Sequence, residues 1–316
     1  MPVIQSQFRP AWWLSNPHLQ TIWGTLFRRQ PQLELRTERL ELADGDFVDL
    51  AWSGPASGAM VLVLHGLEGT LNSHYARGLL RTLNNLGYRT CFMHFRGCSG
   101  EANRLPRSYH SGETGDLQEV VEHVRHRTAL HAVVGFSLGG NVLLKWLGEQ
   151  QESAAISKAV AVSVPFRLDD AARRLEGGLS RVYQQHLLNK LKQKYRVKFS
   201  QMPSPLRVNL DNIKTFYQFD DAITAPLHGF HNADDYYTRS SSYPFLKRIR
   251  TPSLVIHAID DPFMWPGTVP DNSDLSPAVT LELASHGGHV GFITGPVPGL
   301  ARYWLDERIG QWLSAD

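Results

Sequence analysis

A serine flanked by glycines is the strongest chemical signal in the sequence. Residues 135–140 read GFSLGG and contain Gly-x-Ser-x-Gly, a pattern that places a nucleophilic serine on a tight turn between a strand and a helix. An apolar run at 132–136 precedes this turn, and a helix-like segment at 138–147 follows it. Glycine is needed at both flanks, because a side chain there would collide with the neighbouring strand and helix. The pattern predicts that the Ser137 hydroxyl lies at a helix N-terminus, where developing negative charge is favoured.

A serine hydroxyl is a weak nucleophile until a base takes its proton, and the base expected with this motif is a histidine late in the chain. The sequence has 14 histidines. His289 lies in the segment SHGGHVGF at 285–292, directly after the last expected strand, and His286 in the same segment is the alternative. We favour His289, because the two glycines before it give its loop backbone freedom.

A carboxylate should fix the tautomer of the histidine and stabilise its cation. An expected strand at 253–257 runs into the segment AIDDP at 258–262. In folds built around such a serine turn, a small residue usually ends this strand, two residues follow, and the acid comes next; this count from Ala258 selects Asp261. Asp260 remains the alternative acid. If Asp261 is the acid, we expect Asp260 to cap the turn or to bind loop amides.

Two backbone amides should hold the negative oxygen that forms during attack on a carbonyl. One belongs to Leu138, which follows the nucleophile. We assign the other to Leu67, in the segment HGLEG at 65–69 behind an apolar run at 60–64. This chemistry requires no metal and no cofactor.

Two further side chains near these motifs, a thiol and a guanidinium, could in principle take part in catalysis or binding. Cys98 has no helix leading out of it and no base paired with it in sequence, so we do not expect it to be a nucleophile. Arg96 is expected to tie loops together rather than to bind substrate.

Apolar runs alternate with helix-like segments along most of the chain. We expect strands at 60–64, 88–92, 132–136, 159–164, 253–257 and 279–283, and helices at 73–86, 116–127, 138–147 and near 300–313. This alternation predicts an α/β fold with a mostly parallel central sheet and helices on both faces.

The alternation breaks between Pro165 and about Ser240. This stretch reads as helices at 169–175, 179–195 and 211–219, an insertion that would lie over the carboxyl ends of the strands, where such sheets bind ligands. We therefore divide the chain into an N-terminal arm at 1–30, a core at 31–165 and 241–316, and a helical cap at 166–240. Residues 166–200 carry nine Lys and Arg against three acidic residues. We interpret them as a solvated helix face; the alternative is attraction of an acidic or lipid substrate.

Composition excludes several classes of protein. The 316 residues are 42% hydrophobic and carry a net charge of +2, which excludes a disordered chain and gives no reason to expect nucleic acid. We see neither a signal peptide nor an apolar window long enough to span a membrane, and expect a cytoplasmic protein. The arm contains Trp12, Trp13 and Leu14, which we interpret as packing against the domain, with peripheral membrane contact as the alternative. Oligomeric state is not indicated.

Taken together, these motifs resemble the α/β-hydrolase superfamily, and more narrowly its YheT-like branch, which includes proteins related to plant Emb8. The likeness covers nearly the whole chain. It includes NPHLQT at 16–21, HGLEG at 65–69, FRGC at 95–98, GFSLGG at 135–140, DYY at 235–237, DDPF at 260–263 and GGHVGF at 287–292.

The resemblance implies a serine hydrolase of the carboxylesterase or lipase type, acting on a small-molecule acyl ester. Ser137, His289 and Asp261 would form its catalytic triad and an acyl-enzyme its intermediate. Two alternatives stay open: an acyltransferase that passes the acyl group to an alcohol with the same triad, and a non-catalytic binding protein on a hydrolase scaffold.

Overall fold

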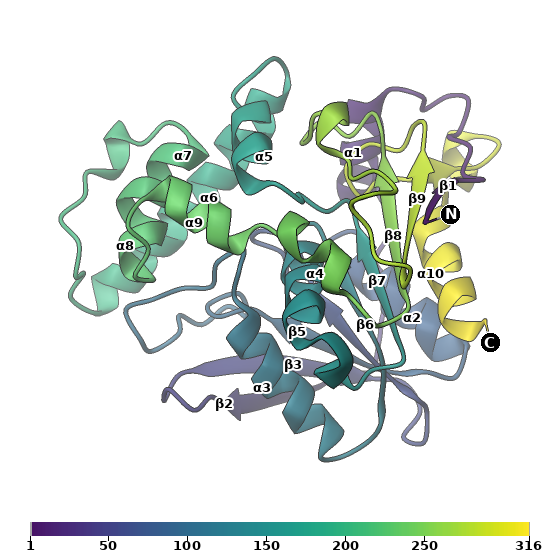
Figure 1. Cartoon of the computed structure of the whole chain (residues 1–316), viewed down its shortest axis with the longest axis horizontal. Helices are drawn as coiled ribbons and strands as arrows, with labels where there is room; N and C mark the ends of the chain where they lie inside the picture. The colour runs from purple at the N-terminus through teal and green to yellow at the C-terminus, as the bar shows by residue number, and fades with distance from the viewer. Residues whose placement is uncertain (1, 316) are drawn as a thin grey trace.

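A nine-stranded sheet lies at the centre of the protein, with helices on both of its faces (Figure 1). The structure, a computed structural model, describes residues 2–315. The strand order is β1-β9-β8-β7-β6-β4-β5-β3-β2. The strands are β1 (Val3–Gln5), β2 (Arg36–Glu41), β3 (Phe47–Ser53), β4 (Met60–Leu64), β5 (Arg89–His94), β6 (Leu130–Phe136), β7 (Lys158–Val162), β8 (Ser253–Ala258) and β9 (Val279–Ala284). A separate antiparallel pair is formed by β10 (Ile293–Thr294) and β11 (Arg302–Tyr303).

The sheet is parallel except at one edge, where β3 pairs antiparallel with both β2 and β5. Every residue of β4 is buried, since helices cover both faces of a central parallel strand. Leu62 and Leu64 pack in one hydrophobic cluster with α3 and α4. Val61 and Val63 point the other way, into a cluster with α2 and α10. The alternating side chains of β4 therefore pack into two hydrophobic cores, one on each face of the sheet.

Helices of the core flank the sheet, and the remaining helices build the N-terminal arm and the cap. The core helices are α2 (Ala76–Asn85), α3 (Thr114–Arg125), α4 (Leu138–Gln150) and α10 (Trp304–Ser314). The arm contributes α1 (Pro17–Phe27), and the cap contains α5 (Leu168–Arg174), α6 (Ser180–Gln201), α7 (Phe216–Phe219), α8 (Ala225–Leu227) and α9 (Ala233–Ser240). Figure 1 shows the cap helices as a teal and green group beside the sheet. No helix within residues 2–315 is long and apolar enough to cross a membrane.

The α/β fold class is confirmed, and each strand expected from an apolar run is present within two residues at each end. The expected helix at 211–219 is wrong. It is divided into a short turn at Leu210–Asn212 and α7, because Thr215 is extended and its hydroxyl accepts from the Gln218 amide, which starts a new helix. The division into arm, core and cap stays a prediction, although residues of the arm supply β1 to the edge of the main sheet.

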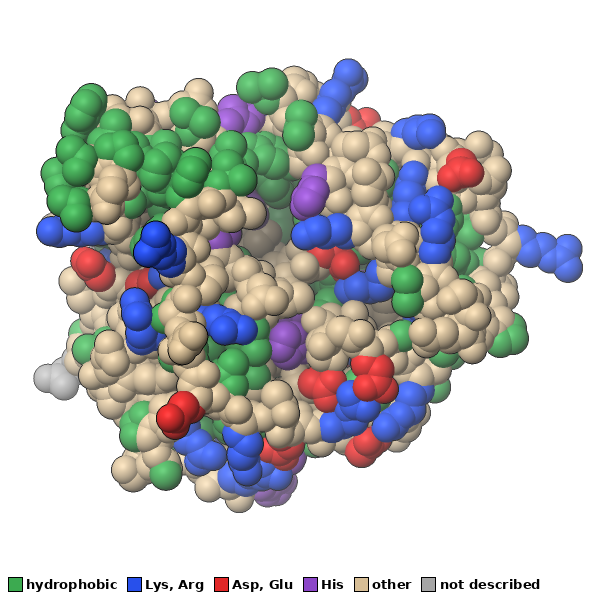
Figure 2. Space-filling view, turned by 180° about the vertical axis from the view of Figure 1, so that it is seen from behind, with side chains coloured by type: hydrophobic (Ala, Val, Ile, Leu, Met, Phe, Trp, Pro, Cys, Tyr) green, Lys and Arg blue, Asp and Glu red, His purple; other side chains and the backbone are tan. Residues whose placement is uncertain are grey.

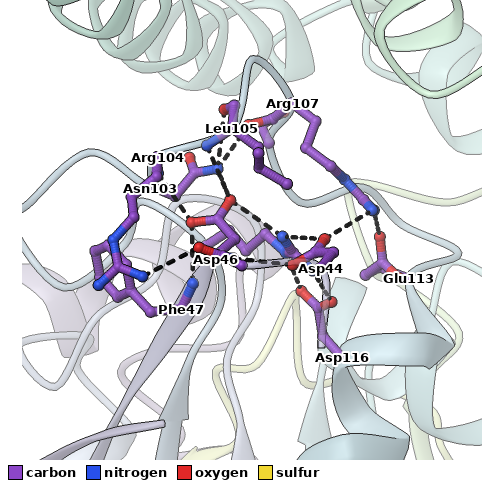
Figure 3. Close-up of polar contacts among 12 residues, drawn as sticks. Asp44, Asp46, Phe47, Asn103, Arg104, Leu105, Arg107, Glu113 and Asp116 are labelled. Atoms are coloured by element: carbon purple, nitrogen blue, oxygen red, sulfur yellow. Dashed lines mark hydrogen bonds and ion pairs between the residues drawn. The ribbon is translucent and has the colours of Figure 1, made fainter. Parts of the chain in front are cut away.

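Arg96 ties loops together, as expected. Its guanidinium binds both oxygens of Asp116 at 2.6 and 2.7 Å and reaches Asp46 at 3.1 Å and Asp44 at 2.8 Å. Figure 3 shows these carboxylates converging below the loop that carries Asn103, whose amide donates to Asp46 at 2.6 Å. The buried network holds the loop after β5 against the edge of the core.

Candidate active site

Ser137 occupies the sharp turn between β6 and α4. Its backbone has φ 51° and ψ −116°, a left-handed conformation that non-glycine residues adopt at a cost of about 1–3 kcal/mol. A side chain at Gly135 would lie 2.4 Å from the carbonyl oxygen of Gly139, and one at Gly139 would lie 2.5 Å from that of His65. The close packing of β4, β6 and α4 therefore explains both glycines of the motif.

His289 and Asp261 lie next to Ser137 in the structure. The Nε2 atom of His289 is 2.9 Å from Ser137 Oγ, and its Nδ1 atom is 2.9 Å from Asp261 Oδ2. Because an ionised carboxylate only accepts hydrogen bonds, Nδ1 carries the proton and Nε2 is left to accept from the serine hydroxyl. Both residues are buried. This arrangement can remove a proton from Ser137.

The two alternative residues contact each other instead. Asp260 Oδ2 lies 3.1 Å from His286 Nδ1, and its Oδ1 accepts from the backbone N–H of Gly288 at 3.1 Å. Asp260 thus binds a loop amide, and burial raises the pKa of its carboxyl. The pair supports the turn before His289 and does not contact Ser137.

The loop after β4 contains two backbone amides that are bound by tyrosine hydroxyls and, between them, one that is not. The N–H of Gly66 donates to Tyr75 Oη at 2.9 Å, and that of Glu68 donates to Tyr109 Oη at 2.8 Å. The intervening Leu67 amide makes no such bond, and neither does the Leu138 amide, within residues 2–315. Both leucines line the same cavity as Ser137. The assignment of these two amides to an oxyanion hole stays a prediction.

His65 shapes this loop from inside the core. Its Nδ1 lies 2.7 Å from the carbonyl oxygen of Gly66, and its Nε2 accepts from the Phe95 amide at 3.1 Å. Burial lowers the pKa of His65 to about 3, so the ring is neutral and can satisfy both contacts at once. His65, which directly follows β4, therefore has a structural role in the loop that contains Leu67.

A mainly apolar cavity extends from Ser137 and His289 into the cap. Its apolar cap-side lining consists of Leu168, Ala171, Ala172, Leu175, Leu187, Leu191, Phe199, Phe216, Phe219, Ile223 and Leu227. These side chains come from α5 and the residue that follows it, from α6, α7 and α8, and from the π-helical turn Asp220–Thr224 between α7 and α8. A cavity of this composition suits a hydrocarbon chain attached to the reacting group.

Five of the nine basic residues at 166–200 are exposed, as a solvated face requires, but three lysines of α6 depart from that interpretation. Lys192 donates to the carbonyl oxygen of Ile213 at 2.5 Å, and Lys194 contacts Glu68 Oε1 at 2.7 Å. Lys198 is buried and donates to Asn103 Oδ1 at 2.6 Å, and burial lowers its pKa to about 8. Lys194 and Lys198 satisfy polar groups of the core, whereas Lys192 satisfies a carbonyl within the cap.

Cys98 lacks the exposure and the low pKa of a catalytic thiol, although the Lys194 ammonium contacts its sulfur at 3.0 Å. It is 5% exposed, and burial raises the pKa of its thiol to about 11, so the thiolate is disfavoured at neutral pH.

Three contacts that hold the His289 loop were not predicted from the sequence. Thr21 Oγ1 accepts from the backbone N–H of His289 at 2.9 Å, and Ser163 Oγ accepts from that of Val290 at 3.0 Å. The ring of Phe263 stacks on the imidazole of His289 with centroids 4.0 Å apart. Thr21 and Phe263 lie in NPHLQT and DDPF, two segments that carry the family resemblance. Membership of these segments is the one feature of the sequence that could have pointed to them.

The fold and the site define a class of protein. The family described as the alpha/beta hydrolase fold matches residues 59–296, and the chain belongs to it.

Individual relatives place the chain more narrowly. It is 45% identical to "Putative esterase YheT" of Escherichia coli (strain K12), with 98% of this chain and 93% of that one covered, which confirms the YheT-like resemblance. It is 29% identical to the human phospholipase ABHD3, with 99% and 80% covered. A solved structure, the esterase Pf2001 of Pyrococcus furiosus, matches with a TM-score of 0.57 at 18% identity over 90% of this chain and 97% of that chain. That last likeness concerns the fold.

Proposed function

We propose that the chain is a serine hydrolase that cleaves carboxylic esters through an acyl-enzyme on Ser137. The observation that carries the proposal is the placement of His289 Nε2 2.9 Å from Ser137 Oγ, with Asp261 on the other ring nitrogen. Relatives support the reaction class, since one carries the name esterase and another the name phospholipase. Both names describe enzymes that hydrolyse ester bonds.

In the first half of the reaction, Ser137 Oγ attacks the ester carbonyl carbon while its proton moves to His289 Nε2. The negative carbonyl oxygen accepts hydrogen bonds from the Leu67 and Leu138 amides, and each such donor typically contributes 10²–10³ in rate. Asp261 stabilises the imidazolium without taking its proton. The carbon–oxygen bond to the alcohol then breaks, and His289 gives the proton to the departing oxygen.

In the second half, His289 takes a proton from water as the water oxygen attacks the acyl carbon. The bond to Ser137 Oγ breaks, the proton returns to the serine, and the carboxylic acid leaves. The apolar cavity under the cap would hold the acyl chain throughout, because most of its lining is aliphatic or aromatic.

The test is hydrolysis of p-nitrophenyl esters with acyl chains of two to sixteen carbons. We expect activity in the wild type with an optimum above four carbons, and a loss of at least about 10³-fold in Ser137→Ala. Ser111→Ala is the matched control, because Ser111 lines the same cavity and its hydroxyl has no place in the proposed mechanism. Ester hydrolysis that survives Ser137→Ala would overturn the proposal.

A further inference from the structure

The helix α1 buries two polar side chains and exposes three large apolar ones. Gln20, Thr21 and Gly24 form its buried side. Gln20 donates to the carbonyl oxygens of Leu14 and Ile293 at 2.8 and 2.9 Å. This is the reverse of an ordinary surface helix, in which the apolar stripe faces the core.

The outward side of α1 is strongly apolar. Leu19 is 47% exposed, Leu26 63% and Phe27 61%. Together with Trp23, they follow one another at helical spacing, so they lie on one face. The ring of Trp23 packs 4.4 Å from that of Phe27 and 4.7 Å from that of Trp13.

A neighbouring loop extends this apolar face. Trp12 is 77% exposed, which corrects the interpretation that it packs against the domain, whereas Leu14 is buried as expected. The indole of Trp12 donates to the carbonyl oxygen of Pro296 at 2.8 Å, beside the exposed Val297 and Leu300. Figure 2 shows hydrophobic side chains gathered at one end of this side of the molecule. We call Trp12, Leu19, Trp23, Leu26, Phe27, Val297 and Leu300 the α1 face.

The two segments that supply the α1 face carry charges of one sign. Residues 1–33 contain no Asp or Glu, and neither do residues 286–304. The same two segments carry the exposed residues Arg9, Arg29 and Arg302. The acidic Asp306 is buried and neutralised by its ion pair with Arg28. An apolar surface with a rim of cations attracts a surface that is negative outside and hydrocarbon inside.

We propose that the α1 face binds the surface of a bilayer that contains anionic phospholipid, without spanning it. Trp12 has the properties of an interfacial anchor, because its ring is exposed while its N–H is already satisfied by the protein. The exposed arginines of these two segments favour an anionic lipid surface over a second copy of this chain, since the like charges of two copies would repel each other. The proposal does not depend on the hydrolytic chemistry.

The α1 face lies on the same helix that supports the site. Thr21, on the inner side of α1, accepts from the backbone N–H of His289, and His18 lies 3.1 Å from Tyr183 Oη in the cap. A bilayer held by the outer side of α1 would therefore lie next to the junction of the cap and the core.

The test is co-sedimentation of the full chain with vesicles of phosphatidylcholine and phosphatidylglycerol in a 7:3 ratio at low salt. We expect most of the wild type to sediment, at least about fivefold more than with vesicles of phosphatidylcholine alone, and less as salt screens the arginines. The double variant Leu26→Ser and Phe27→Ser should lose at least about fivefold in bound fraction. It should keep the melting temperature of the wild type, which shows that it is folded.

Leu86→Ser is the matched control, because Leu86 is 51% exposed and lies outside the α1 face. This variant should sediment like the wild type. Equal binding by the wild type and the double variant would overturn the proposal, as would the absence of vesicle binding. A stable dimer of the wild type that the double variant abolishes would assign the α1 face to a second copy and would also overturn it.

Discussion

Thr21 Oγ1 accepts a hydrogen bond from the backbone N–H of His289 at 2.9 Å, across 268 positions of sequence. The hydroxyl is itself fixed, since it donates to the carbonyl oxygen of Pro17 at 2.7 Å. A side chain at Gly288 would lie 2.4 Å from the same carbonyl oxygen, so α1 and the histidine loop are in close contact. The first helix of the chain therefore positions the proposed base.

Replacement of Thr21 should reduce catalysis through this contact. Thr21→Val keeps the shape but leaves the buried His289 amide without an acceptor, at a cost of about 1–3 kcal/mol. We expect kcat to fall on the order of tenfold with little change in KM for a soluble ester. Thr21→Ser keeps the hydroxyl and should restore most of the rate. An unchanged kcat in Thr21→Val, or an equal loss in Thr21→Ser, which keeps the hydroxyl, would contradict a role for this hydrogen bond.

Phe263 holds the other side of the imidazole. Its ring lies parallel to that of His289 within 3°, and its backbone N–H donates to Asp261 Oδ1 at 2.8 Å. Phe263→Leu keeps the backbone contact but removes the stacking, so the imidazole loses orientation. We expect kcat to fall about tenfold to a hundredfold, measured by steady-state ester hydrolysis. An unchanged kcat with raised KM would assign the ring to substrate binding alone.

The two adjacent aspartates should differ sharply in their effects. Asp261→Asn removes the charge that stabilises the His289 cation, and kcat should fall by roughly 10³–10⁴. Asp260→Asn leaves the triad contacts in place and should cost less than about tenfold. The comparison is made on one ester at one pH, with melting temperature as the folding control. The reverse order of effects would make Asp260 the acid.

Asp220 in the cap should make stability depend on pH. Burial raises the pKa of its carboxyl from 3.8 to about 6, so the folded state favours the protonated form. This contribution to stability is complete below about pH 4 and is lost as pH rises through about 6. Asp220→Asn should therefore raise the free energy of unfolding at pH 8 by on the order of 2 kcal/mol, with little change at pH 4. Urea unfolding at both pH values tests this, and an equal change at both would contradict it.

The sequence predicted the parts of the fold that depend on burial on both faces. The strand β4 is a run of five buried apolar residues, and such a run is visible without any knowledge of its partners. In contrast, β1 has only three residues at the sheet edge, and β2 reads as charged because it is half exposed. Their pairing depends on distant strands, which local patterns do not contain.

The candidate site divides in a similar way. Ser137 and His289 have local signatures in their flanking glycines, and Asp261 follows from its distance to the end of a strand. The supports of the site, Thr21 and Phe263, act through contacts formed only when α1 and the loop after β8 fold against the histidine loop. Residue type alone does not reveal such contacts.

The most direct test of the account is covalent labelling of the wild type with a fluorophosphonate, followed by peptide mass spectrometry. This reagent reacts with a serine whose proton is removed by a neighbouring base, as His289 would do for Ser137. We expect one label per chain, on Ser137, and a loss of ester hydrolysis in proportion to the labelling. Ser137→Ala should carry no label. A chain that hydrolyses esters while the label is absent from Ser137 would contradict it.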